Sequence, residues 1–89
     1  MDFETVHNFY ERLVLEKVVE LSSTELEGSS DGALCDIACV ALNRLPAYYV
    51  RHNVDTYFYM PVIEHHKVDA EVDDAVSYAI NFIAEHQPD

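Results

Sequence analysis

The chain has 89 residues, of which 49% are hydrophobic, so it suits one small domain, because chains below roughly 150 residues rarely form two independent cores. Seventeen acidic residues against five basic ones give a net charge of −12, which opposes a phosphate backbone and argues against binding to long DNA or RNA. A core this small also favours association with a second copy, and we expect a homodimer.

The start of the chain and its hydropathy argue against export and membrane insertion. Acids at Asp2 and Glu4 stand where a secretory signal would carry lysine or arginine. Charges interrupt every apolar run before it reaches the ~18 residues of a membrane span. Cys35 and Cys39 are the only cysteines, and their spacing puts them one helical turn apart, where a disulfide is geometrically unfavourable. We therefore expect a cytoplasmic protein whose reduced thiols pack as small hydrophobic groups.

A first helix is predicted from Asp2, its N-cap, to about Leu21, because apolar residues recur there at helical spacing. The apolar face consists of Phe3, Val6, Tyr10, Leu13, Val14, Val18 and Leu21. Leu15 and Val19 lie on roughly the opposite side, among charged residues, and are the candidate dimer interface. The alternative is that they are two ordinary exposed aliphatic side chains.

A loop from Ser22 to Gly32 separates this helix from a second one. The second helix is predicted from about Ala33 to Leu45, with Ser30 or Asp31 as its cap and Pro46 as its end. Its apolar residues extend around most of its circumference, which places this helix at the centre of the fold.

The last part of the chain predicts a hairpin and a third helix. Pro46–His52 favours extended structure and Thr56–Met60 is β-branched and aromatic, so Asn53–Asp55 is expected to be the turn between two strands. The helix is expected from Val68 or Asp69 to His86, with four acids in its first turns: Asp69, Glu71, Asp73 and Asp74. The predicted fold is therefore mainly α with a small β part (α+β): three helices and a short hairpin in a single domain over residues 1–89.

Signals for catalysis or metal binding are weak. The sequence has no nucleophile elbow, phosphate-binding loop or zinc-protease motif, and its two glycines cannot build a phosphate cradle. Cys35 with Cys39, the His65–His66 pair and His52 are the pointers to a metal, whereas a closed zinc site takes four arranged ligands. We expect a non-enzymatic protein with no metal or cofactor.

The rare basic residues are more informative. Arg44 and Arg51 flank a segment that contains Tyr48 and Tyr49. Guanidinium groups match phosphate oxygens and planar rings stack on bases, so these four residues are the candidate nucleotide-binding site. The alternative is that both arginines pair with some of the seventeen acids.

Residues 36–50, DIACVALNRLPAYYV, closely resemble the signature of the late competence development ComFB family, D-[IV]-x-A-L-A-L-N-x-L-P-P-x-Y-V. The signature positions carried over to this chain include Asp36, Asn43, Leu45, Pro46 and Tyr49. Ala47 replaces the second proline and Cys39 replaces an alanine, both mild changes. Several members carry a zinc-binding cysteine cluster before the signature, whereas residues 27–32 here are EGSSDG, so zinc is not expected.

The resemblance implies a small, mainly helical, cytoplasmic dimer without catalytic activity. Some members of the family are receptors for cyclic dinucleotides, cyclic di-GMP or cyclic di-AMP, and affect motility and natural competence through type IV pili. Two functions are therefore considered for this chain: a cyclic-dinucleotide receptor, and a protein–protein adaptor that has the same fold, binds a regulatory partner and takes no nucleotide.

Overall fold

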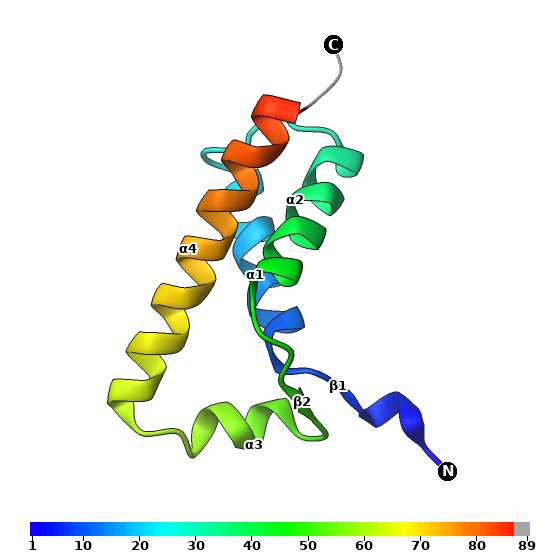
Figure 1. Cartoon of the computed structure of the whole chain (residues 1–89), viewed down its shortest axis with the longest axis vertical. Coiled ribbons are helices and arrows are strands. Elements are labelled where there is room, and N and C mark those ends of the chain that lie inside the picture. The colour runs from blue at the N-terminus through cyan, green and yellow to red at the C-terminus, as the bar shows by residue number, and fades with distance from the viewer. Residues whose placement is uncertain (87–89) are drawn as a thin grey trace.

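A computed structural model describes residues 1–86, without the side chains of residues 53–55. After a short 3-10 turn at Phe3–Thr5, the elements in chain order are β1 (His7–Asn8), α1 (Phe9–Ser22), α2 (Asp31–Arg44), β2 (Tyr49–Val50), α3 (Asn53–Phe58) and α4 (Val62–His86). Figure 1 shows α1, α2 and α4 side by side, with α3 crossing at one end and the first residues projecting from the body. The protein is therefore mainly helical, as predicted, although residues 1–86 form four α-helices instead of three.

The first helix begins later than predicted. The side chain of Asn8, not Asp2, caps α1 by accepting a hydrogen bond of 3.1 Å from the backbone N–H of Tyr10. The preceding residues leave the body of the protein, so Phe3 and Val6 are exposed instead of joining the apolar face. Phe3 and Val6 have the helical spacing of the apolar residues in α1, but they precede the first residue of that helix.

The second helix was predicted closely. The Ser30 hydroxyl accepts a hydrogen bond from the Ala33 backbone N–H at 3.1 Å, and α2 ends at Arg44, shortly before Pro46. Gly28, in the loop before it, has φ of +87°, a left-handed conformation that suits glycine. The prediction of the N-cap and of the loop is confirmed.

The predicted hairpin is wrong. Tyr49–Val50 does form a strand, but it pairs antiparallel with His7–Asn8, with His7 opposite Val50 and Asn8 opposite Tyr49. The second predicted strand, Thr56–Met60, lies instead in and after α3. The strand Tyr49–Val50 therefore pairs with a strand near the start of the chain, and the predicted hairpin turn does not form.

The third predicted helix is α4, and it begins at Val62 instead of Val68 or Asp69. The carbonyl oxygen of Pro61 accepts the backbone N–H groups of Glu64 and His65, at 2.9 and 3.0 Å, which starts the helix directly after the proline. The acids from Asp69 onward thus lie in the middle of α4 and do not complement its N-terminal dipole, contrary to the prediction.

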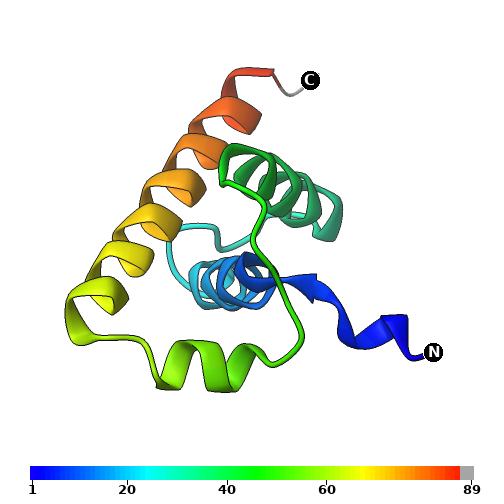
Figure 2. The same ribbon diagram turned by 60° about the horizontal axis from the view of Figure 1, so that its bottom comes forward.

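The core lies where α1, α2 and α4 meet. Its largest fully buried side chains are Val14 of α1 and Val76 of α4, with Ala41 of α2 and Ala79 of α4 also fully enclosed. In Figure 2, α1 is surrounded by α2, α4 and the chain that connects them. Each of these three helices contacts the other two, and α1 has more buried residues than α2, so the prediction that α2 is the central helix is not confirmed. Nor does its apolar character make it buried all round, because a face of α2 that includes Cys35 and Cys39 is exposed.

Helix α4 is the longest element, yet charged residues occur throughout it. Within residues 1–86, no helix combines the length and the apolar character that crossing a bilayer requires.

Candidate functional site

The predicted nucleotide-binding residues lie at the end of α2 and in the segment that follows it. Arg44 is the last residue of α2, Tyr48 precedes β2, Tyr49 lies in β2 and Arg51 follows it. Pro46 ends the helix and turns the chain towards β1, because proline cannot continue a helical hydrogen-bond pattern. All four side chains are exposed.

Arg44 is held at the surface by an aromatic ring. Its Cζ lies 3.9 Å from the centroid of the Tyr78 ring, which belongs to α4. A guanidinium over a ring face is attracted by the negative face of the π-system, and at an exposed site this is worth ~0.5–1 kcal/mol. The contact holds the Arg44 guanidinium group against α4.

The two tyrosines have different surroundings. Tyr48 packs edge-on against Phe9 of α1, with ring centroids 5.3 Å apart, and its carbonyl oxygen accepts the Phe9 backbone N–H at 2.6 Å. Tyr49 pairs through its backbone with Asn8 and has a more exposed ring. Tyr48 is therefore a partly structural residue, whereas the ring of Tyr49 is free to contact a ligand.

The alternative that the two arginines pair with acids is not supported by the described side chains. Among these side chains, the ion pairs are Arg12 with Glu16, at 2.7 Å, and Lys17 with Asp73 and Glu20, at 3.4 and 4.0 Å. Neither Arg44 nor Arg51 takes part in one of them.

The other signature residues surround this segment. Asp36 and Asn43 are exposed on α2, and the Asn43 side-chain amide donates a hydrogen bond of 3.0 Å to the carbonyl oxygen of Cys39. Leu45 packs against the core, while Pro46 is exposed. Leu45 thus has a structural role, whereas Asp36 contributes a surface carboxyl group.

The cysteines and the candidate dimer residues all face outward. Cys35 and Cys39 are free and exposed, so the expectation that they pack as small hydrophobic groups is wrong. No cluster of three or more histidine, cysteine or acidic side chains able to hold a metal occurs within the described part of the chain. Leu15 and Val19 are 50% and 69% exposed, which agrees with their predicted position away from the core.

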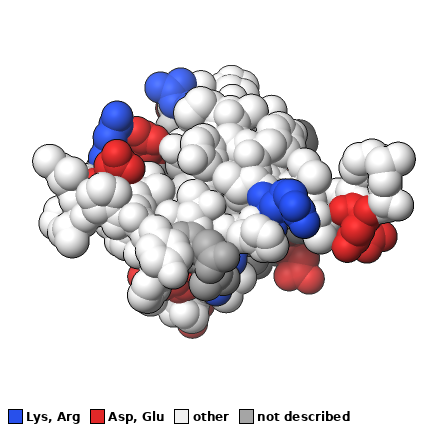
Figure 3. All heavy atoms as spheres, turned by 90° about the horizontal axis from the view of Figure 1, so that it is seen from below, with Lys and Arg blue, Asp and Glu red and all other residues white. Residues whose placement is uncertain are grey.

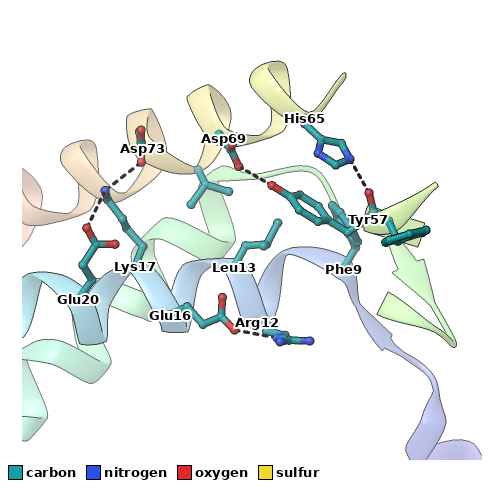
Figure 4. Close-up of a pocket in the computed structure, with 12 residues that line it drawn as sticks. Phe9, Arg12, Leu13, Glu16, Lys17, Glu20, Tyr57, His65, Asp69 and Asp73 are labelled. Carbon is teal, nitrogen blue, oxygen red and sulfur yellow. Dashed lines mark hydrogen bonds and ion pairs between the residues drawn. The ribbon is translucent and has the colours of Figure 1, made fainter. Parts of the chain in front are cut away.

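Sequence reasoning missed a groove of about 810 Å³ between α1, α3 and α4 (Figure 4). The residues that line it are Phe9, Arg12, Leu13, Glu16, Lys17, Glu20, Tyr57, Phe58, His65, Asp69, Val72 and Asp73. The predicted apolar face of the first helix includes Leu13 but not Phe9. One end of the groove depends on Tyr57 and Phe58 of α3, in a segment that the sequence suggested to be a strand.

Polar contacts link α3 to α4 at one end of this groove. The Tyr57 hydroxyl donates to the Asp69 carboxylate at 3.2 Å, and the rings of Tyr57 and His65 stack with centroids 4.3 Å apart. Burial, followed by the nearby charge of Asp69, raises the pKa of Tyr57 above its usual value of 10.0. The hydroxyl therefore stays protonated and remains a donor across the physiological pH range.

A smaller hollow of about 300 Å³ lies on the other side of Phe9. There the Tyr10 hydroxyl donates a 2.8 Å hydrogen bond to the Glu71 carboxylate and ties α1 to α4. Burial, and then this hydrogen bond, raise the pKa of Tyr10 to about 12.

Viewed from the end formed by α3 and β2, the surface is mainly uncharged (Figure 3). The lysine and arginine side chains visible there are separated from one another and do not form a single basic patch.

These features define a small helical domain with two exposed arginines beside tyrosine residues and an open groove between its helices. Residues 7–87 match the family model described as late competence development protein ComFB, and the chain belongs to this family. The resemblance of residues 36–50 to the family signature is thereby confirmed. No curated protein and no solved structure gives a significant match.

Proposed function

We propose that this protein is a non-enzymatic cytoplasmic regulator that binds a cyclic dinucleotide through Arg44 and Arg51. Membership of a family named for late competence development supports a competence-related regulatory role. One observation supports nucleotide binding: Arg44 and Arg51 lie on either side of two exposed tyrosines. Neither arginine forms an ion pair with the described acids. Guanidinium forks bind phosphate oxygens in a bidentate manner, and aromatic rings stack on bases.

A dimer would suit a ligand of this kind. A cyclic dinucleotide has two phosphates and two purines, so a two-fold homodimer can offer each half the same residues. The exposed pair Leu15 and Val19 is the proposed interface. Light scattering should then give about twice the chain mass, and Leu15→Glu with Val19→Glu should weaken the association without loss of helicity, because like charges would crowd the interface.

Calorimetric titration with cyclic di-GMP and cyclic di-AMP tests the nucleotide proposal. Arg44→Ala and Arg51→Ala should each cost roughly 1.5–3 kcal/mol of binding free energy, the value of a charge-assisted hydrogen bond. Arg12→Ala is the matched control, because Arg12 is exposed but pairs with Glu16 on a different face. Unchanged affinity in both test variants would place the ligand elsewhere, and absence of binding at high micromolar nucleotide would refute the proposal.

The adaptor function remains the second candidate, because one observation favours it independently. Large apolar side chains around the junction of α3 and α4 are exposed in the single chain: Phe58, Tyr59, Val62 and Ile63. A concentration of such residues at one place is typical of a protein–protein contact surface.

A further inference from the structure

The groove between α1 and α4 has an apolar floor that continues onto the surface. Phe9 and Val72 form its buried base, and the half-buried Leu13 points from α1 into the space between the two helices (Figure 4). Phe58 of α3 lies at the rim and packs edge-on against Tyr59, with ring centroids 5.2 Å apart. The floor is thus continuous with the exposed apolar residues at the junction of α3 and α4.

The rim of the groove is acidic. Four carboxylates line it, from Glu16, Glu20, Asp69 and Asp73, against the two cations of Arg12 and Lys17. Both cations already lie beside carboxylates of this rim, so negative charge is left in excess (Figure 4). The net charge of −12 adds a field of the same sign, which favours a basic partner and opposes anionic lipids and nucleic acids.

The walls also determine the form of the partner. Both walls are α-helices, whose backbone N–H and C=O groups bond within the helix. A partner strand therefore finds no free sheet edge on these walls, and recognition must use side chains. An amphipathic helix forms its backbone hydrogen bonds internally. It presents apolar side chains at i, i+3 and i+4 along one face, and this face fits an apolar floor between two helices.

We propose that this groove binds a basic amphipathic helix of a partner protein. The apolar face of that helix lies on Phe9, Leu13 and Phe58, and its lysine and arginine side chains pair with the acidic rim. The inference deepens the adaptor function and rests on it, and it is independent of nucleotide binding by Arg44 and Arg51.

Fluorescence anisotropy with a labelled 14-residue peptide of leucine and lysine at helical spacing tests this proposal. The same peptide with glutamate at every lysine position should not bind. Phe58→Ser should weaken binding of the lysine peptide about tenfold, because truncating an aromatic anchor typically costs more than 1 kcal/mol. Phe3→Ser is the matched control, since Phe3 is 70% exposed against 73% for Phe58 but lies outside the groove. Equal effects of the two variants would overturn the proposal while leaving an adaptor function on another face.

A second pair of variants tests the charge. Asp73 lines the groove, whereas its neighbour Asp74 is exposed and lies outside it. Asp73→Asn should weaken peptide binding several-fold more than Asp74→Asn, although both remove one charge from the chain. An identical loss would mean that the peptide responds only to net charge, and the proposed site would then be wrong.

A second copy of this chain is the competing occupant of the groove. Light scattering of the wild type and of Phe58→Ser distinguishes a second copy in the groove from a partner helix. The partner-helix proposal expects Phe58→Ser to leave the oligomeric state unchanged. Conversion of a wild-type dimer into a monomer by this substitution would assign the groove to self-association and overturn the proposal.

Discussion

Apolar residues are buried in the bundle of α1, α2 and α4 but exposed at the junction of α3 and α4. In the bundle, short side chains such as Val14, Ala41 and Val76 are fully enclosed, which lets the helices approach closely. At the junction, larger residues such as Phe58 and Ile63 face outward. The difference teaches that hydrophobic content alone does not identify the core of a small domain, because part of it belongs to a surface suited to contact with partners.

The largest effect is expected from a charge in the bundle. Val76→Asp should unfold the protein, because Val76 is 1% exposed and an unpaired buried carboxylate costs several kcal/mol, on the order of the whole stability of a small domain. Circular dichroism should show loss of helix. Ile63→Asp, at a residue that is 78% exposed, should keep the helical spectrum. Unfolding of both variants would contradict the contrast between the two regions.

A smaller loss is expected when one hydrogen bond at the edge of the bundle is removed. Tyr10→Phe deletes the hydroxyl that donates to Glu71 and leaves the ring in place. Because the acceptor is charged, chemical denaturation should detect a loss of about 1.5 kcal/mol in the free energy of unfolding. Tyr59→Phe, at an exposed residue, provides the control and should have no measurable effect.

The same hydroxyl should make stability depend on alkaline pH. Its pKa is about 12 in the folded protein against 10.0 for an ordinary tyrosine, so the folded state retains the proton longer. The contribution of Tyr10 is complete below pH 10 and is lost as the pH rises from about 10 to 12. The melting temperature, measured by thermal denaturation at each pH, should therefore fall less steeply over this pH range in Tyr10→Phe than in the wild type. Parallel curves would show that the Tyr10 proton is not linked to folding.

Truncation of the junction should change stability little. Phe58→Ser should alter the free energy of unfolding by no more than about 0.5 kcal/mol, as is usual for an exposed side chain outside the core; its ring contact is with Tyr59, which is exposed as well. Urea denaturation measures this directly. A loss of several kcal/mol would mean that Phe58 supports the fold and is not a free contact residue.

The smallest effect is expected on the outer face of α2. Both cysteines are exposed, so alkylation should modify two thiols in the folded protein and leave the melting temperature unchanged. Mass spectrometry counts the adducts. Modification only after unfolding would contradict the outward position of Cys35 and Cys39.

The sequence was most informative where structure is local. The apolar spacing around Val14 and the Ser30 cap depend on residues within a few positions, and both were predicted correctly. The pairing of His7–Asn8 with Tyr49–Val50 joins distant segments, and the β propensity of Tyr57 and Phe58 gave way to a short helix that packs against Phe9. Since β propensity depends strongly on context, neither outcome could be read from the local pattern.

The same limit applies to the candidate sites. The exposed arginines and tyrosines could be selected because basic residues are rare in this chain. The contact of Arg44 with Tyr78 and the groove beside α3 could not be predicted, because each requires the packing of segments far apart in sequence. The start of α4 at Val62, earlier than the sequence suggested, is a further feature that only the assembled fold reveals.

Helix α4 has 25 residues, or about 37 Å at 1.5 Å per residue, but its buried side chains lie only between Val68 and Ala79. Amide hydrogen exchange should therefore be slowest in this middle section and faster in the first turn after Pro61 and in the turn that ends at His86. Local opening of the first turn would change the width of the groove without unfolding the bundle. An occupied groove should consequently slow exchange of the amides at the start of α4 more than those of its middle.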